Sequence, residues 1–225
     1  MVNADLKNKI NRMLNVFEND SGSPETDYTT IYLYHDGNNQ RRQVTLGRGF
    51  TDDGGNLKSV VTNYISKAGK YSDNFKKYVG AFGKGTLDDN KEFMALLVKA
   101  SKEDQLMKDA QDETFDAKYW TPAFKFFTDN GFKKPLSMAV IMDSYLHSGS
   151  ILSFLRNRFS ASVPAKGGDE KVWIEEYVRV RRQWLVSRGK PLSNTIYRAD
   201  FFIVQMKKGN WDFNCPLVAN DRKLC

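Results

Sequence analysis

The fold of this chain is constrained most by a single β-hairpin pattern near the N-terminus. Helical periodicity follows it almost to the C-terminus. Residues 29–34 (TTIYLY) are β-branched and aromatic, residues 35–40 (HDGNNQ) supply turn residues, and residues 41–50 (RRQVTLGRGF) return as a second strand. After Gly54 and Gly55, apolar residues recur at helical spacing in successive segments. We therefore expect an α+β, mostly helical protein with one small sheet.

An amphipathic helix is expected before the hairpin, over residues 4–18, because apolar side chains recur there every three or four positions. The Gly and Pro of the loop at residues 19–24 end this helix, so the carboxyl group of Glu18 should lie at the helix exit. Further along, residues 135–146 (PLSMAVIMDSYL) carry little charge and predict a buried helix that spans two lobes.

The composition and charge exclude several classes of protein. With 225 residues, 40% of them apolar, the chain can bury its own core, and no window approaches the roughly 18 apolar residues of a membrane span. The net charge of +7 attracts polyanions. Basic residues cluster at 179–188, but the aromatic residues among them follow helical spacing, which favours a core over base stacking. We expect neither membrane insertion nor nucleic-acid binding.

The sequence offers no pattern for a metal or cofactor site. Cys215 and Cys225 lie without a CxxC motif or a nearby histidine, so they either form one local disulfide or remain free. The only histidines, His35 and His147, are too few for a histidine-based metal site, and no Ser-His-Asp or Cys-His signature is present.

Two acids, a threonine and a glycine-flanked turn follow one another in a recognisable order. Glu18 ends the first helix, Asp36 lies at the hairpin tip, Thr45 lies in the return strand, and residues 47–51 read GRGFT. This order resembles the lysozyme superfamily, in which a carboxyl at the end of a helix faces a second carboxyl on a hairpin across a saccharide cleft.

Two branches of that superfamily are similar to different parts of the chain. Residues 34–37 (YHDG) followed by residues 44–49 (VTLGRG) are similar to phage-type lysozymes. Residues 18–19 (EN), residues 47–51 (GRGFT) and residues 142–149 (MDSYLHSG) look like the chitosanases of glycoside hydrolase family 46.

The resemblance implies a lysozyme-like, two-lobed fold for the whole chain, residues 1–225. A small hairpin lobe would cover about residues 28–55, and a larger helical lobe would comprise about residues 1–18 and 56–225.

One residue departs from the family 46 pattern. That family places its catalytic aspartate two residues before the arginine of the GRG turn, where this chain has Leu46. Either the base has moved to Asp36 or it is lost. We favour the move, because Tyr-x-Asp at a strand end followed by Thr in the return strand reproduces the lysozyme order. Asp52 and Asp53, just past the turn, are rival bases.

The local chemistry suits Glu18 and Asp36 to different roles. Glycoside hydrolysis needs one protonated carboxyl for the leaving oxygen and one ionised carboxyl to activate water or to attack. The helix dipole and the apolar Phe17 both disfavour negative charge on Glu18, which suits the acid. Asp36, in a polar turn, should stay ionised and suits the base. The hydroxyl of Thr45 would hold the attacking water.

The resemblance also implies supporting roles. Tyr34, Arg48 and Thr51 would bind substrate. Asp143 lies in an apolar segment, and a buried acid needs a partner. It would therefore give structural support in a charge network, with Arg181 or Arg182 as its partner.

We therefore expect an inverting glycoside hydrolase, monomeric and without a cofactor or metal, that cleaves a β-1,4-linked amino-sugar polysaccharide. Peptidoglycan ranks first, as for an endolysin-like or effector-like muramidase, because a cationic protein is attracted to an anionic wall and repelled by cationic chitosan. Cleavage of chitosan is the alternative. A non-catalytic wall-binding or structural module, or a lytic transglycosylase, stays open.

The expected location follows from the same considerations. No apolar signal-peptide core follows Met1. We therefore expect synthesis in the cytoplasm and action on the cell wall after lysis or dedicated export.

Overall fold

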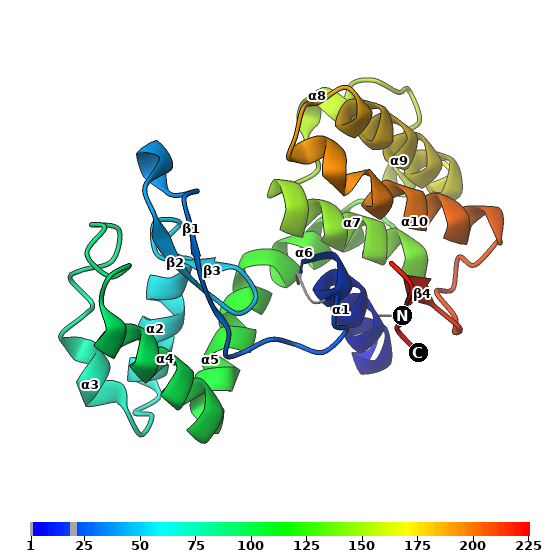
Figure 1. Ribbon diagram of the computed structural model, residues 1–225. Coiled ribbons are helices and arrows are strands. Elements are labelled where there is room, and N and C mark those ends of the chain that lie inside the picture. Colours follow the sequence, from blue (N-terminus) through cyan, green and yellow to red (C-terminus); the bar gives the residue numbers. More distant parts are fainter. Residues whose placement is uncertain (1, 19–21) are drawn as a thin grey trace. The chain divides into compact units, whose positions relative to one another are not determined.

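The computed structural model describes residues 2–18 and 22–225, and the chain divides into two compact units (Figure 1). The larger unit comprises Met1–Pro24 and Lys118–Cys225, and the smaller unit comprises Glu25–Ala117. The residues 19–21 of the predicted loop lie outside the described residues.

A three-stranded antiparallel sheet begins the smaller unit. Its strands follow one another in the order β1 (Ile31–Tyr34), β2 (Gln43–Leu46) and β3 (Phe50–Thr51), with a short 3-10 turn η1 (Asn38–Gln40) between β1 and β2. The central strand β2 is buried along its whole length, whereas the second half of the edge strand β1 is exposed. The hairpin is confirmed, and β3 adds a strand to it.

Four helices complete the smaller unit: α2 (Asn56–Ser66), α3 (Ser72–Lys76), α4 (Lys91–Glu103) and α5 (Gln105–Phe115). The apolar face of α2 is fully buried, and α2 packs against both β3 and α5. For that reason residues 56–117 form one compact unit with the sheet, whereas the sequence placed them in the helical lobe.

The larger unit consists of helices and one short hairpin. Its elements are α1 (Ala4–Glu18), α6 (Thr121–Asp129), α7 (Pro135–Ser148), α8 (Ser153–Arg156), α9 (Glu170–Val186), α10 (Ile196–Lys207), β4 (Val218–Ala219) and β5 (Arg222–Lys223), with 3-10 turns η3 (Pro164–Lys166) and η4 (Leu192–Thr195). A π-helical turn, η2 (Asp116–Trp120), leads from α5 into α6.

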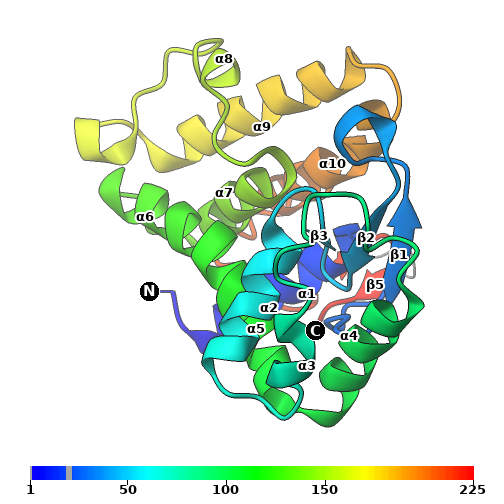
Figure 2. The same ribbon diagram turned by 90° about the vertical axis from the view of Figure 1, so that its left-hand side faces the viewer.

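Helix α7 is the centre of the larger unit (Figure 2). Every residue from Leu136 to Ser144 is buried, and α7 packs against α1, α6, α9 and α10. Gly149 ends the helix with a left-handed φ of 77°, a conformation that suits glycine. The predicted buried helix is confirmed, but it lies within one unit because all its packing partners belong to that unit.

The C-terminal residues are tied back to α1. A disulfide joins Cys215 to Cys225, with their Cα atoms 5.7 Å apart, so the cysteines are paired. The Arg12 Nε of α1 donates a hydrogen bond to the Leu224 carbonyl at 2.7 Å. Among the described residues, no helix has both the length and the apolar character needed to cross a bilayer. The predicted α+β, mostly helical class is confirmed.

Candidate active site

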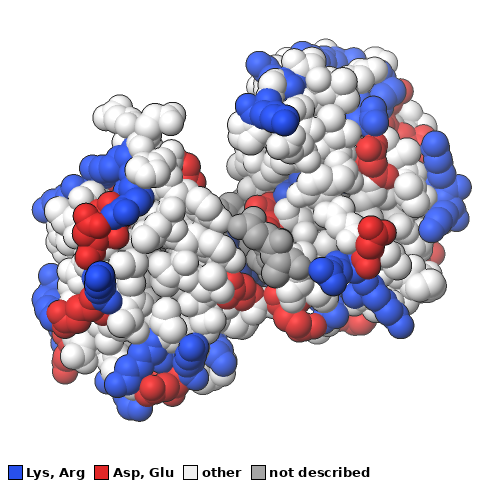
Figure 3. All heavy atoms as spheres, in the orientation of Figure 1, with Lys and Arg blue, Asp and Glu red and all other residues white. Residues whose placement is uncertain are grey.

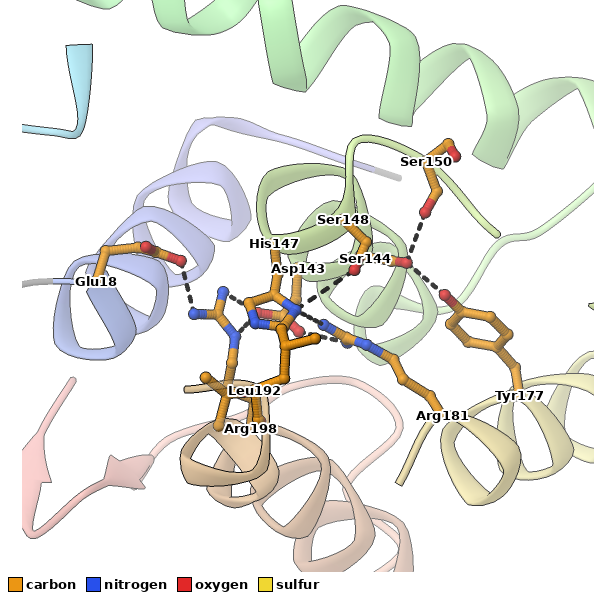
Figure 4. Close-up of polar contacts among 11 residues, drawn as sticks. Glu18, Asp143, Ser144, His147, Ser148, Ser150, Tyr177, Arg181, Leu192 and Arg198 are labelled. Atoms are coloured by element: carbon orange, nitrogen blue, oxygen red, sulfur yellow. Dashed lines mark hydrogen bonds and ion pairs between the residues drawn. The ribbon is translucent and has the colours of Figure 1, made fainter. Parts of the chain in front are cut away.

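Glu18 is the last residue of α1, as the sequence predicted. The end of this helix is fixed by its neighbour Phe17, whose ring packs edge-on against Tyr197 and Phe201 of α10. The Tyr197 hydroxyl also donates to the Phe17 carbonyl at 2.8 Å. The Glu18 side chain is 41% exposed, and its Oε1 accepts a hydrogen bond from Nη1 of Arg198 at 2.6 Å (Figure 4). The carboxyl is therefore held in place but open to solvent.

Arg198 connects Glu18 to a buried ion-pair network around Asp143. Its Nε and Nη2 donate to Asp143 Oδ1 at 2.9 and 2.6 Å, and Nη1 of Arg181 donates to Asp143 Oδ2 at 2.5 Å. Burial by itself would raise the pKa of Asp143, but attraction to Arg198 and Arg181 outweighs it and lowers this pKa to about 2. Asp143 thus stays ionised and holds both guanidinium groups.

His147 follows Asp143 by one turn of α7 and faces the same arginines (Figure 4). Its Nδ1 lies 3.3 Å from Nη2 of Arg181. Burial, together with the positive charges of Arg198 and Arg181, lowers the pKa of His147 to about 4. The imidazole is therefore neutral near neutral pH.

The expectation that Asp143 pairs with an arginine is confirmed for Arg181. It is wrong for Arg182, which lies on another face of α9 and pairs with Asp200 at 2.5 Å. Sequence reasoning missed Arg198. Because 55 residues separate it from Asp143, the only signal in the sequence was that a buried acid needs a partner.

On the hairpin, Asp36 lies two residues beyond β1 and is exposed. Its Oδ1 accepts a hydrogen bond from Nε2 of Gln43 at 2.9 Å. Gln43 pairs with Tyr34 in the strand register. The ring of Tyr34 is 43% exposed and stacks on Tyr32, with ring centroids 5.6 Å apart and planes 11° apart. The hairpin end therefore presents a carboxylate and an aromatic surface to solvent.

The carboxylates of the rival bases, Asp52 and Asp53, are buried and accept hydrogen bonds from backbone N–H groups. Asp52 is 2% exposed and accepts a hydrogen bond from the Gly83 N–H at 2.8 Å, and burial raises its pKa. The Asp53 side chain is 4% exposed, accepts from the Asn38 N–H at 2.8 Å and pairs with Arg41. Of the three aspartates, only Asp36 is open to a polymer.

The threonines and Leu46 lie in the sheet. Thr45 is 6% exposed, and its hydroxyl has no hydrogen-bond partner within residues 2–18 and 22–225. The Thr51 hydroxyl accepts from the Gly54 N–H at 3.2 Å and so closes the following turn. Leu46 is fully buried. The water-holding role of Thr45 and the binding role of Thr51 stay predictions.

The arginine of the GRGFT turn is held inside the smaller unit. The Arg48 side chain is 6% exposed, lies 3.6 Å above the Phe115 ring centroid and donates to Asp112 Oδ1 at 2.8 Å. Burial lowers the pKa of Arg48 despite Asp112. The Tyr28 hydroxyl donates to the same carboxylate at 2.9 Å. These contacts fasten the turn to α5, and direct substrate contact by Arg48 stays a prediction.

The other hairpin cations are also paired. Arg41 pairs with Asp53, and Arg42 pairs with Asp88 at 3.2 Å and with Asp89. On the face shown in Figure 3, basic and acidic side chains lie intermixed. The positive charge of the hairpin is therefore offset locally, so net charge is a poor guide to the substrate. In the part of the chain that the structure describes, no three His, Cys, Asp or Glu side chains gather as a metal site would require.

Comparison with known proteins places the chain among the glycoside hydrolases of lysozyme-like α+β fold. More narrowly, it belongs to glycosyl hydrolase family 46, whose profile matches residues 12–217. The predicted resemblance and the predicted enzyme class are confirmed.

The similar proteins align over most of their length. A chitosanase of Bacillus subtilis (strain 168) is 27% identical over 235 residues, which cover 96% of this chain and 82% of that protein. The native chitosanase from Bacillus subtilis MY002 has a TM-score of 0.81 at 25% identity, covering 99% of this chain and 96% of that one. A glutamate-to-alanine mutant of the MY002 enzyme, complexed with 6 GlcN, has a TM-score of 0.82 at 24% identity, with the same coverage.

A more distant similarity is to the GH46 chitosanase of Gynuella sunshinyii in complex with chitotetraose. Its TM-score is 0.79 at 20% identity, and the match covers 99% of this chain and 98% of that one. At this identity the likeness concerns the fold alone.

Proposed function

We propose that this glycoside hydrolase cleaves the β-1,4 linkages of chitosan, with Glu18 as the general acid and Asp36 as the general base. The observation that carries the substrate is the family 46 match over residues 12–217, with nearly full-length similarity to proteins named chitosanases. Chitosan thereby replaces peptidoglycan as the first choice. The argument for peptidoglycan depended on the net charge of +7, but the hairpin arginines Arg41 and Arg42, which contribute to that charge, are paired with carboxylates.

In the proposed reaction, the Glu18 carboxyl gives its proton to the glycosidic oxygen as the bond from that oxygen to the anomeric carbon breaks. Arg198 fixes which way the Glu18 carboxyl points. Water attacks the anomeric carbon from the opposite face, and its proton passes to the carboxylate of Asp36. This single displacement inverts the anomeric configuration. It leaves Glu18 ionised and Asp36 protonated, and proton exchange with solvent returns both carboxyls to their starting states.

The assignment of Asp36 as the base is supported by the surroundings of the alternative positions, Leu46, Asp52 and Asp53. Leu46, at the family's position for the base, is apolar and fully buried, so it cannot accept a proton. Asp52 and Asp53 are buried and bonded to backbone N–H groups, whereas Asp36 is exposed. We retain Tyr34, Arg48 and Thr51 as proposed substrate-binding residues.

Peptidoglycan is the second candidate substrate, for one specific reason. The chain departs from family 46 at Leu46 and instead carries Asp36 and Thr45 in the order of phage-type lysozymes. A site with a relocated base can serve a different amino-sugar polymer.

Parallel assays on the two polymers test this proposal. Reducing-end release from chitosan and loss of turbidity of peptidoglycan would be measured for the wild type, for Glu18→Gln and for Glu175→Gln, an exposed glutamate on α9. We expect cleavage of chitosan by the wild type and by Glu175→Gln, and a loss of about 10² to 10⁴-fold for Glu18→Gln. Cleavage of peptidoglycan alone would reverse the substrate order, and inactivity on both would favour a binding module.

We also propose that the enzyme works as a monomer outside the cytoplasm, after lysis or export. The Cys215–Cys225 disulfide supports this location, because such bonds persist mainly in oxidising compartments. Thiol-specific labelling of the protein recovered from cells and from medium, with size-exclusion chromatography of the latter, would test both points. Full labelling of both cysteines outside the cell would contradict the proposal.

A further inference from the structure

Gln43, the first residue of β2, carries a buried amide that links two parts of the hairpin. The residue is 5% exposed. A buried amide costs free energy unless both its ends are hydrogen-bonded. Here both ends are: Nε2 donates to Asp36 Oδ1 at 2.9 Å, and Oε1 accepts from the Asp53 N–H at 3.0 Å. Gln43 thus joins the turn after β3 to the carboxylate of Asp36.

The orientation of this amide follows from its partners. The Asp53 N–H can only donate, so the Gln43 oxygen has to face it, and the Gln43 NH₂ group is left to face Asp36. The amide cannot turn over without placing a donor against a donor. Asp36 therefore receives a hydrogen bond of fixed direction, which stabilises its negative form and restricts its rotation.

The far end of the bridge is anchored firmly. The buried carboxylate of Asp53 accepts a hydrogen bond from the Asn38 N–H at 2.8 Å and pairs with Arg41. It therefore holds two residues of the hairpin tip in place. The tip packs tightly on this carboxylate, since a Cβ atom at Gly37 would lie 2.5 Å from Asp53 Oδ2. The peptide that fixes Gln43 is thus itself fixed.

We propose that Gln43 is a positioning residue for the reaction: its NH₂ group orients the Asp36 carboxylate for water activation. This inference rests on the proposed role of Asp36 as the base. It predicts that the amide of Gln43 acts through its NH₂ group on the protonation and geometry of Asp36, and contributes little to substrate affinity.

Gln43→Met and Gln43→Glu test the inference, with kcat, KM and their pH dependence measured on the polymer that the wild type cleaves. Methionine keeps the volume but removes both hydrogen bonds. We expect kcat to fall about 10- to 100-fold, the scale of one hydrogen bond to a charged group, with KM within about twofold. The acidic limb of the pH–rate profile should move to higher pH, because Asp36 loses the donor that stabilises its negative form.

The glutamate variant keeps the shape and changes the charge. Its carboxyl would face Asp36, so its activity relative to the wild type should decrease further as the pH rises and that carboxyl ionises. If Gln43→Met is too unstable to assay, the pH dependence of this nearly isosteric variant is sufficient to test the inference.

Gln111→Met is the matched control. Gln111 is a fully buried glutamine of the same unit, and its Nε2 donates to the Tyr28 carbonyl at 3.2 Å and to Ser101 Oγ at 3.1 Å. This variant should lower the melting temperature without moving the pH–rate profile, which separates positioning from structural support.

The outcomes distinguish the inference from the proposed function. If Asp36→Asn is inactive while the Gln43 variants keep the wild-type kcat and pH profile, Gln43 has no positioning role and the proposed function stands. If Asp36→Asn keeps wild-type activity, the base is elsewhere and both assignments fail. The inference is supported if the pH–rate profiles of the Gln43 variants are shifted while the profile of Gln111→Met matches that of the wild type.

Discussion

Replacement of Asp143 by asparagine should be among the most destabilising isosteric changes in the larger unit. Asp143 is fully buried and accepts three hydrogen bonds from the guanidinium groups of Arg198 and Arg181. Asparagine removes the negative charge and turns one acceptor atom into a donor that faces guanidinium N–H groups. Two buried cations then lose their common counter-ion.

The size of the effect can be worked out in two ways. Removal of one member of a buried ion pair costs about 3–5 kcal/mol in the free energy of unfolding. The decrease in the pKa of Asp143 from 3.8 to about 2 corresponds, at about 1.36 kcal/mol per unit, to about 2 kcal/mol that depends on its ionisation. Because the pKa is lower in the folded state, this stabilisation is complete above about pH 4 and is lost as the pH falls through about 2. About 1 kcal/mol of it should disappear between pH 5 and pH 3.

Urea unfolding followed by tryptophan fluorescence measures both quantities. The control is Asp200→Asn, the same substitution in the exposed pair with Arg182, whose side chains are 47% and 41% exposed. It should cost no more than about 1 kcal/mol. The reasoning is refuted if Asp143→Asn lies within about 1 kcal/mol of the wild type at pH 7, or if the gap between them stays constant from pH 5 to pH 3.

Three further predictions concern catalysis and pH. Asp36→Asn should lose most of its kcat while Asp52→Asn keeps the larger part, measured by reducing-end release; the reverse ranking would move the base past the GRGFT turn. The first product should be the α-anomer, because a single displacement inverts the configuration, and the β-anomer in early NMR spectra would contradict this. The pKa of His147 is about 4 when folded, below its usual 6.5, so its neutral form stabilises the fold above pH 6.5. That contribution, no more than about 3 kcal/mol, should be lost as the pH falls toward 4, and His147→Gln should show a weaker pH dependence in urea unfolding over that range.

Periodicity sufficed to predict the long elements. The apolar spacing before Glu18 and the uncharged run at residues 135–146 correspond to α1 and α7. The strand β3 could not be found in this way, because two residues are too few to show an alternating pattern. The packing of α2 on the sheet was equally invisible, since helical spacing shows that a face is buried but not what covers it.

The site could be predicted only where a residue's own neighbours in sequence decide its role. Glu18 at a helix end and Asp36 in a polar turn are such cases. The network around Asp143 is different, because Arg198 lies 55 residues away in sequence and only the requirement for some partner could be foreseen. The bridge through Gln43 also escaped prediction, because its amide spans two turns that pair only in the folded hairpin.

The arginines that hold the carboxylates of this protein stay protonated and do not react with amine reagents, so amine chemistry can act on the lysines alone. Arg41, Arg48 and Arg198 are each bound to an acid, whereas lysines such as Lys58 and Lys84 are exposed. Acetylation with an amine-specific reagent would remove lysine charges one at a time and leave every guanidinium untouched. The resulting charge ladder, resolved by native electrophoresis, would lower the +7 net charge stepwise at constant fold. Rates along that ladder would give the contribution of long-range attraction to polymer capture, free of any change at Glu18 or Asp36.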